Sequence, residues 1–350
     1  MYRLIVSAIL MIFITAGCGD SGTGPAPDPG THGWIVGNSS GSVPTILTTV
    51  DGLEWTAQGG TISLPNAGLS SVSVVDSSIV WAAGGISEGF GVVIKTTDGG
   101  QTWERMGNES QIPESILSVK GFSGDVAWIC GDDNCIYRTT DGGVTWHDLS
   151  SQEYEGYSWQ GVSGINQESI WISGGTEETG AIIHSSDGVL WTSHGDSLVG
   201  DWPMISIVQL DQNNLWAVGH GFTIVKSTDG GIEWELVTPD SLHGSGNDAN
   251  GITLLSPSDA WVVLDYGNIW RTTDGGVSWD YQTIPSEAAG FFMLRISAMD
   301  SNTAWVSGGS AFGSPEGIIL HTIDGGASWT RQDDGTLPIL WDVGFSGEFN

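Results

Sequence analysis

The sequence predicts an all-β fold, a single seven-bladed β-propeller, and three observations support this prediction. An Asp-Gly pair with a Trp four or five residues after the Asp occurs seven times, a second Trp recurs in each repeat, and short apolar runs separate the copies. A period of about 40–50 residues with several strands per period is typical of a propeller and not of a helical array. Successive aspartates are 47, 43, 46, 42, 45 and 50 residues apart, and they are Asp51, Asp98, Asp141, Asp187, Asp229, Asp274 and Asp324.

The repeated motif, here called the Asp-box, has a local structural explanation. Its clearest copy is Thr140-Asp141-Gly142-Gly143-Val144-Thr145-Trp146. An Asp side chain accepts hydrogen bonds from N–H groups just beyond it, and glycine takes the positive φ of a tight turn. The Trp then supplies a large apolar surface for packing one blade on the next. We expect the box aspartates to be structural and to bind no metal, because calcium needs several oxygen ligands on one loop.

The second Trp marks a short buried strand that ends at a turn, in contexts such as Trp-Ile-Val-Gly and Trp-Ala-Ala-Gly. Together with the boxes, these strands divide each repeat into four strands, placed in the third repeat at 116–122, 126–130, 135–139 and 144–149. The seven residues are Trp34, Trp81, Trp128, Trp171, Trp216, Trp261 and Trp305.

The ends of the chain predict how the ring closes. Segments that resemble 116–122 begin near residues 69, 116, 159, 204, 249 and 293, and a seventh, at 340–345, lies at the C-terminus. The N-terminal side of the propeller begins instead with the strand of Trp34. We expect 340–345 to become the innermost strand of the first blade, because closure removes the exposed edges of an open sheet.

These repeats resemble the Asp-box repeat of bacterial neuraminidases. The wider pattern from Gly131 to Trp146, with its Ile-Tyr-Arg-Thr-Thr run, is similar to the photosystem II stability/assembly factor family, and the resemblance covers residues 33–350. It implies a non-catalytic propeller that helps to assemble a membrane complex by holding an unassembled membrane-protein subunit, or another envelope protein. Better-studied members carry an arginine-rich patch, and this chain departs from them because it lacks that pattern.

The N-terminal residues predict export. Residues 4–14 form an apolar run broken only by Ser7, which is too short to span a bilayer and has the length of a signal-peptide core. Thr15-Ala16-Gly17-Cys18 resembles a bacterial lipobox, with Thr15 where Leu is usual. We therefore expect residues 1–18 to be a lipoprotein signal ending at the lipidated Cys18, 19–32 a flexible tether, and 33–350 the propeller. The protein would be anchored in the bacterial cell envelope, periplasmic or at the surface; ordinary secretion is the alternative.

The charged residues of the sequence restrict which partners and which enzymatic activities the protein can have. The net charge of −32 argues against nucleic acid, because so acidic a chain repels phosphate backbones. Sialidases hold their carboxylate substrate with three arginines around the channel. In this sequence Arg295 is the single Arg on a predicted inner strand, and Lys120 is the only other cation on one. The lack of an arginine cluster therefore argues strongly against sialidase activity. An inverting glycosidase with two carboxylates remains a third-ranked alternative, although similar xyloglucan-cleaving enzymes use two tandem propellers.

The remaining reactive side chains predict no cofactor and no metal site. Cys130 and Cys135 flank four residues, and facing strand positions lie near disulfide distance, so we expect a disulfide, with two buried free thiols as the alternative. The seven histidines show no ligand spacing, and no catalytic Ser/His/Asp order stands out.

Aromatic residues outside the repeat pattern predict a binding face. Four Trp belong to neither repeated position, and three of them, with three further aromatics, lie near the starts of inner strands. Ring closure would gather these starts around one mouth of the channel, where aromatics can hold an apolar peptide segment or stack on a sugar. A cell-surface glycan-binding module is thus the rival binding function, and packing between blades is the structural alternative. The predicted face consists of Tyr157, Trp159, Trp202, Phe291, Phe292, Trp341 and the deeper Arg295.

Overall fold

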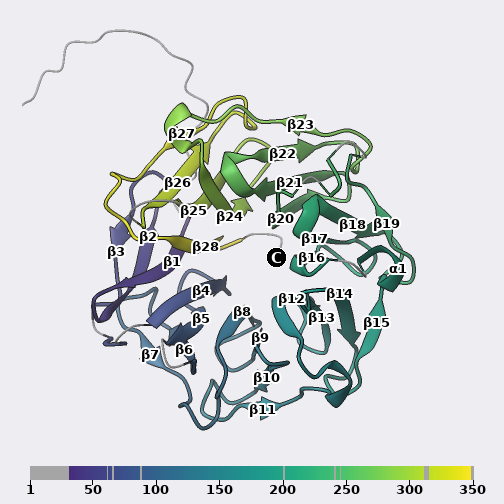
Figure 1. Cartoon of the computed structure of the whole chain (residues 1–350). Coiled ribbons are helices and arrows are strands. Elements are labelled where there is room, and N and C mark those ends of the chain that lie inside the picture. Colours follow the sequence, from purple (N-terminus) through teal and green to yellow (C-terminus); the bar gives the residue numbers. More distant parts are fainter. Residues whose placement is uncertain are drawn as a thin grey trace, which may run out of the picture.

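The computed structural model is a ring of seven four-stranded antiparallel sheets around a central channel (Figure 1). It describes residues 31–347 apart from 61, 65–66, 87–88, 200–201, 240–241, 245 and 311–314. The predicted signal, Cys18 and most of the tether lie outside the described residues. Within the described part of the chain, no helix combines the length and apolar character needed to cross a membrane.

Each blade runs from an inner strand at the channel to a short outer strand. Blade 1 consists of β28 (Leu340–Phe345), β1 (Gly33–Ser40), β2 (Val43–Thr49) and β3 (Thr56–Ala57). Blade 2 consists of β4 (Ala67–Val74), β5 (Val80–Ile86), β6 (Gly91–Thr96) and β7 (Glu104–Arg105). Blade 3 consists of β8 (Ile116–Gly121), β9 (Ala127–Gly131), β10 (Ile136–Thr139) and β11 (His147–Asp148). Blade 4 consists of β12 (Ser158–Asn166), β13 (Ser169–Gly175), β14 (Gly180–Ser185) and β15 (Thr192–His194).

The other three blades have the same order, and the few helical segments lie in connections. Blade 5 consists of β16 (Met204–Gln209), β17 (Leu215–Gly219), β18 (Thr223–Ser227) and β19 (Glu235–Leu236). Blade 6 consists of β20 (Ala249–Ser256), β21 (Asp259–Leu264), β22 (Ile269–Thr272) and β23 (Asp280–Tyr281). Blade 7 consists of β24 (Phe291–Ala298), β25 (Ala304–Ser310), β26 (Gly317–Thr322) and β27 (Thr330–Arg331). The helix α1 spans Asp196–Val199, and the 3₁₀ turns are η1 (Gln152–Tyr154), η2 (His220–Phe222), η3 (Asp265–Gly267) and η4 (Ser286–Ala288).

The C-terminal strand closes the ring as the sequence predicts. β28 pairs antiparallel with β1, with Phe345 opposite Gly33 and Val343 opposite Ile35; in Figure 1 the yellow strand lies beside the purple one. Phe345 is fully buried, and its ring centroid lies 4.1 Å from that of Trp305 in blade 7 and 5.9 Å from that of Trp55 in blade 1. One side chain of the last strand thus joins the last blade to the first.

The outer strands are shorter than the sequence suggested. Instead of 144–149, blade 3 ends in the two-residue strand β11, because Thr145 belongs to the Asp-box turn. The N–H and hydroxyl of Thr145 donate to the two carboxylate oxygens of Asp141 at 2.9 and 2.6 Å, and Thr139 donates to the same carboxylate at 2.9 Å. These bonds lower the pKa of Asp141 to about 2, the Thr145 hydroxyl contributing most. The box is a self-contained turn whose carboxylate oxygens are occupied.

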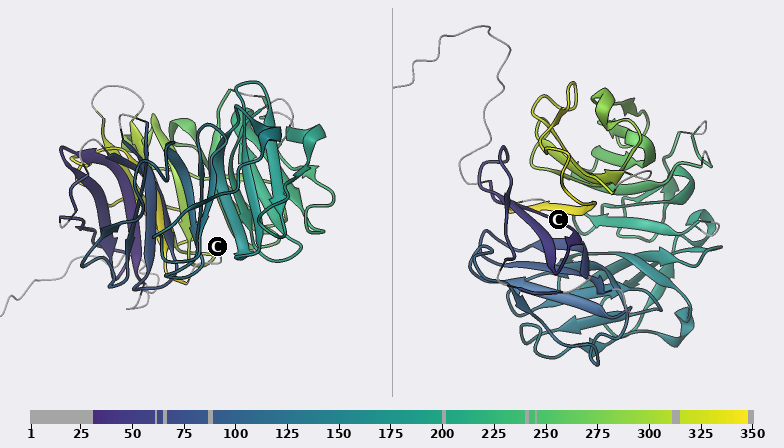
Figure 2. Two further views of the ribbon diagram at one scale, coloured as in Figure 1. Left: turned by 90° about the horizontal axis from the view of Figure 1, so that it is seen from below. Right: turned by 60° about the vertical axis from the view of Figure 1, so that its left-hand side comes forward.

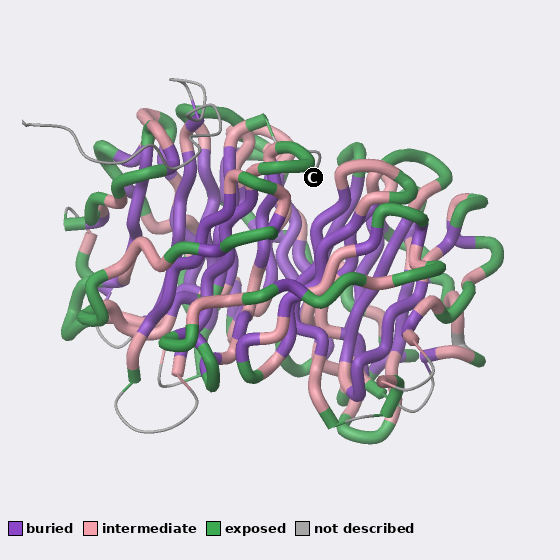
Figure 3. Tube along the Cα trace, turned by 90° about the horizontal axis from the view of Figure 1, so that it is seen from above, coloured by how far each residue is buried: buried purple, intermediate pink, exposed green. Residues whose placement is uncertain are grey.

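Tryptophan pairs pack one blade on the next at five of the seven blade interfaces. The second-strand Trp of one blade meets the box Trp of the following blade edge to face, with centroids 5.7 to 6.3 Å apart, and both side chains are largely buried. Figure 3 shows the buried strands as a continuous interior, with exposed residues at the two faces and the rim. The pairs in this arrangement are Trp81–Trp146, Trp128–Trp191, Trp171–Trp234, Trp216–Trp279 and Trp261–Trp329.

Three cations reinforce the contacts between neighbouring blades. Lys95 lies over the ring of Trp81 in its own blade, and its Nζ donates to the carbonyl of Gly142 in the next Asp-box at 2.8 Å. Lys226 and Arg271 make the same bond to the first box glycine of the blade that follows them. The position three residues before the box Asp is therefore a structural position, as the repeated pattern of Lys, Arg and His suggests.

Inner-strand side chains connect neighbouring blades around the channel. The N–H of Val72 donates to Asp342 Oδ2 at 2.8 Å, which ties β4 to β28. The same contact continues from blade to blade through serines. Val119 N donates to Ser71 Oγ, Val162 N to Ser118 Oγ, and Gln209 N to Ser163 Oγ, at 2.9 to 3.2 Å.

The predicted disulfide is absent, and both cysteines are buried free thiols. The register explains this correction, because Cys130 lies opposite Ile136 and not opposite Cys135. The connecting loop holds one residue more than the prediction assumed, so the two side chains fall on opposite faces of blade 3 and enter different core clusters. Burial raises the pKa of both thiols well above their usual range, which makes them unreactive.

His321 predicts an acid-sensitive step in unfolding. It is buried, stacks on Trp305 at 4.5 Å, and burial lowers its pKa to about 4 from 6.5. Between these values the unfolded chain binds a proton that the folded protein excludes, so stability falls as pH decreases from about 7 to about 4.5, by roughly 2–3 kcal/mol from this group. Denaturant unfolding at the two pH values checks this. The His321→Gln variant should show a shallower loss, and an unchanged slope would contradict the assignment.

Candidate binding site at the channel mouth

A β-bulge occurs at the same place in every inner strand. In each, one residue near the start is left without a partner in the neighbouring strand, as between Leu69 and Ser71 in β4 or between Ile116 and Ser118 in β8. A bulge redirects the extra side chain out of the regular alternation. The seven bulge residues, one per blade, are Ser70, Leu117, Gln160, Ile205, Asn250, Leu294 and Trp341.

All seven bulge residues line one cavity at the mouth of the channel. Its volume is about 310 Å³, and His220 and Arg295 complete the lining. Four bulge residues are apolar, three are polar and uncharged, and no carboxylate is among the lining residues that the structure describes. In a protein with a net charge of −32, this mouth is therefore a place where an apolar or acidic segment meets little repulsion. The side view in Figure 2 shows the ring as a disc, so such a mouth opens on one of its two faces.

Glycines in the second strands permit these bulges. A Cβ placed on Gly84 would lie 1.9 Å from the carbonyl oxygen of Gly68, and one on Gly131 would lie 2.1 Å from that of Ser115. Gly174, Gly219, Gly308 and Gly37 meet the inner strand in the same way, at 2.2 to 2.4 Å. The glycine of each Trp-x-x-Gly segment thus leaves room for the bulged strand. Blade 6, with Leu264, is the exception.

A hydrogen-bonded network stabilises one side of the mouth. His220 Nδ1 pairs with Asp248 Oδ2 at 2.9 Å, and this hydrogen bond raises the pKa of His220. Asp265 accepts from Asn250 Nδ2 at 2.9 Å, and the carbonyl of Asn250 accepts from Arg295 Nη1 at 2.6 Å. Burial raises the pKa of Asp265. Asp248 and Asp265 are held by these hydrogen bonds and are not among the lining residues of the cavity, whereas His220 and Arg295 line it.

A second cavity extends the mouth outward over blades 4 and 5. It has a volume of about 410 Å³ and shares Gln160 and His220 with the mouth. Trp202, 44% exposed, lies in its wall together with Glu177. The two cavities form one surface that runs from Trp341, 37% exposed, to Trp202.

The structure brings together only part of the predicted face. Trp341 and Arg295 lie at the mouth and Trp202 at its extension. Trp159 is fully buried and donates from Nε1 to Asn134 Oδ1 at 3.0 Å, so it is a core residue, contrary to the expected surface position.

The other three aromatics pack against neighbouring side chains. Phe291 is also buried, under Arg331. The partly buried Tyr157 stacks on Trp159, and Phe292 packs against Tyr266.

The sequence prediction missed six of the seven bulge residues. It followed aromatic side chains, whereas the bulge places Ser70, Leu117 and Gln160 at the mouth by backbone position. The available signal was the Trp-x-x-Gly glycine, which predicts a close approach of the paired inner strand and hence a bulge there. Among the described residues, no group of three or more His, Cys, Asp or Glu could hold a metal ion.

These features define the class of protein, an Asp-box β-propeller with a cavity at one channel mouth. The chain belongs to the family described as photosynthesis system II assembly factor YCF48, whose model matches residues 27–154 and 246–338. The extension around Trp202 and His220 lies between the two matched stretches.

Two curated relatives are both named photosystem II stability/assembly factor HCF136, chloroplastic. The protein from Oryza sativa subsp. japonica is 25% identical over 351 residues, which cover 92% of this chain and 73% of the relative. The protein from Arabidopsis thaliana is 23% identical over 322 residues, which cover 87% of this chain and 66% of the relative. Both relatives are therefore longer than the stretch they share with this chain.

Solved structures show the same fold. A structure described as YCF48 bound to D1 peptide superposes with a TM-score of 0.62 at 21% identity, covering 85% of this chain and 90% of that one. YCF48 from Cyanidioschyzon merolae gives a TM-score of 0.57 at 19% identity, covering 86% and 92%. The GH74 xyloglucanase from Xanthomonas campestris gives a TM-score of 0.65 at 15% identity and covers 89% of this chain but 56% of the enzyme. At these identities the likeness concerns the fold alone.

Proposed function

We propose that this protein is a non-catalytic, lipid-anchored assembly factor that holds an extended segment of a membrane-protein subunit at the channel mouth. The single observation that carries the proposal is the ring of seven bulge residues, which gives every blade one side chain in a shared cavity. Family membership supports it further, and so does the D1 peptide bound to the solved relative YCF48.

The mouth suits a peptide better than a sugar. Its apolar side chains, Leu117, Ile205, Leu294 and Trp341, come from four different blades and do not form one flat aromatic platform. Gln160 and His220 can bond the polar backbone of an extended chain as it continues toward Trp202. An aromatic side chain such as Trp341 and an Arg such as Arg295 are residue types typical of protein-binding hot spots.

Glycoside hydrolysis receives less support from the site. An inverting enzyme needs two carboxylates about 6.5–9.5 Å apart across the substrate. In the described residues the mouth is lined by none, and the nearby Asp248 is bonded to His220 and to the N–H of Gly221. The xyloglucanase likeness therefore adds no catalytic argument.

The proposal is tested by capture and reconstitution. The tagged full chain is recovered from native envelope after crosslinking, and overlapping peptides from every recovered membrane subunit are titrated against the purified propeller. We expect one extended segment to bind and to compete with the intact subunit. Binding of polysaccharide without any peptide would favour the glycan-binding module, and turnover of a polysaccharide panel would favour an enzyme.

The membrane anchor is a separate prediction. Cys18→Ser should release the protein from membranes or leave its signal uncleaved, because the acyl groups that the lipobox pathway attaches to this Cys provide the stable attachment. Mass analysis of the mature N-terminus and membrane fractionation check it. Full membrane retention of the variant, with no acyl mass on the wild-type protein, would contradict the anchor.

A further inference from the structure

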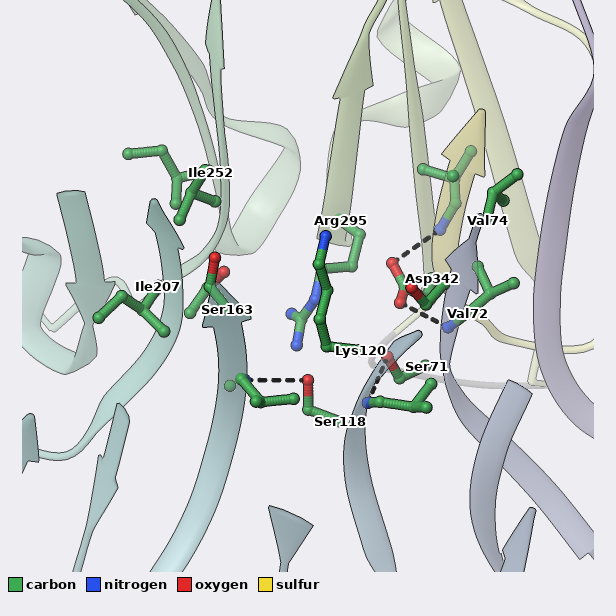
Figure 4. A pocket seen from close by; sticks show the side chains of 18 of the residues that line it. Ser71, Val72, Val74, Ser118, Lys120, Ser163, Ile207, Ile252, Arg295 and Asp342 are labelled. Carbon is green, nitrogen blue, oxygen red and sulfur yellow. Dashed lines mark hydrogen bonds between the residues drawn. The ribbon is translucent and has the colours of Figure 1, made fainter. Parts of the chain in front are cut away.

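The cations of the described propeller divide into two groups. Six of them have structural partners outside the channel. Lys95, Lys226 and Arg271 donate a hydrogen bond to the Asp-box of the next blade. Arg105, Arg138 and Arg331 form ion pairs with acidic side chains. The other two, Lys120 and Arg295, both line a cavity of about 120 Å³ in the middle of the channel. Figure 4 shows both side chains entering this cavity between Ser163 and Asp342.

The cavity has many hydrogen-bond donors. Ser118 and Ser163 use their oxygens to accept an N–H from the next blade, so each keeps a hydroxyl proton to donate. Lys120 and Arg295 add ammonium and guanidinium N–H groups, and neither side chain has an acceptor.

The one carboxylate that lines this cavity is already engaged. Asp342 Oδ2 accepts from Val72 N at 2.8 Å and Oδ1 from Val343 N at 2.9 Å, and Ser71 also bonds to this side chain. Two cations and one carboxylate leave a net charge of +1, inside a protein with a net charge of −32. The cavity therefore has several side-chain donors and is locally positive.

We propose that this cavity binds a small tetrahedral oxyanion, such as inorganic phosphate or sulfate, between Lys120 and Arg295. Its volume exceeds the roughly 30 Å³ that one water occupies in the liquid. A multi-oxygen anion accepts from both cations and from the serine hydroxyls at once, and charge-assisted bonds of this kind are the stronger ones. The site is independent of the proposed partner, although Arg295 lines both this cavity and the mouth.

Ligand-dependent stabilisation tests the proposal. The purified wild-type propeller is melted in phosphate, in sulfate and in chloride at equal ionic strength, and bound ligand raises the melting temperature in a concentration-dependent way. Lys120→Met should weaken phosphate binding roughly tenfold or more, because it removes one charged donor and keeps the side-chain length. Arg105→Met is the matched control, since it removes an equal charge from the outer strand β7, where Arg105 pairs with Glu109.

Selenate diffraction gives a second readout that does not depend on stability. Crystals soaked in selenate should show anomalous density within hydrogen-bonding distance of Lys120 and Arg295. The proposal is wrong if phosphate and sulfate stabilise the wild type no more than chloride does. It is equally wrong if Lys120→Met and Arg105→Met bind phosphate alike, or if selenate occupies only outer surfaces.

Discussion

Deleting residues 339–350 is expected to abolish cooperative folding of the propeller. The truncation removes β28 and leaves β1 as an open inner edge of blade 1. It also removes Phe345 from between Trp305 and Trp55, and the Asp342 carboxylate that accepts from Val72 N. The loss of a buried Phe alone costs about 3–5 kcal/mol, which is comparable to the whole stability of about 5–15 kcal/mol of many domains.

Thermal and denaturant unfolding of three variants measures this effect. The truncation should lose the native transition, and Phe345→Ala should lower the free energy of unfolding by about 3–5 kcal/mol. Trp341→Ala is the control on the same strand, because its side chain is exposed and points to the mouth. If the truncated chain melts like the full propeller, the pairing of β28 with β1 does not hold the ring together.

Trp341→Ala is expected to weaken partner binding by at least about 30-fold and to leave the melting temperature nearly unchanged. An aromatic anchor at a binding site contributes about 2 kcal/mol or more when truncated. Trp202→Ala should give a smaller loss, because Trp202 lies in the extension and not at the centre of the mouth.

Trp159→Ala provides the opposite pattern. Its buried ring packs with Tyr154 and Tyr157, so truncation should cost about 3–5 kcal/mol of stability. Titration of the bound peptide, with unfolding curves for each variant, separates the two behaviours. If Trp341→Ala bound the peptide as tightly as the wild type, the mouth would not be the binding site.

The sequence predicted the ring well because its repeats are local. Each Asp-box is closed by bonds within five residues, as from Thr145 to Asp141, so its turn follows from the motif itself. The closing strand was predictable because the sequence has seven Asp-boxes but only six internal inner strands, so that 340–345 is left to complete the first blade. The pair Cys130 and Cys135 shows the contrast, since one extra loop residue changed the register and moved the two thiols to opposite faces.

The mouth was harder to predict because it depends on the bulges. Regular alternation places Trp159 and Gln160 on opposite faces of a strand, and only the bulge between Trp159 and Gly161 decides that Gln160 points to the channel mouth. The sequence alone does not show whether an aromatic side chain lies in the core or at a surface. Trp341 was identified correctly because it is both aromatic and a bulge residue.

The partners of Lys120 and Arg295 could not be read from the sequence either. Their positions on inner strands were evident, but the carboxylate of Asp342 reaches the same cavity from the far end of the chain. Only the closed ring brings residues 120, 295 and 342 together.

Site-specific photocrosslinking tests the central claim, that the channel mouth binds the partner, most directly. A photoreactive aromatic amino acid is introduced at the position of Trp341 and, as a control, at the position of Ile232, which is 80% exposed on the Asp-box of blade 5. After irradiation in native envelope, we expect an adduct with a segment of one membrane-protein subunit from the mouth position and none from the control. Adducts from the outer position alone, or the same adducts from both, would contradict the claim.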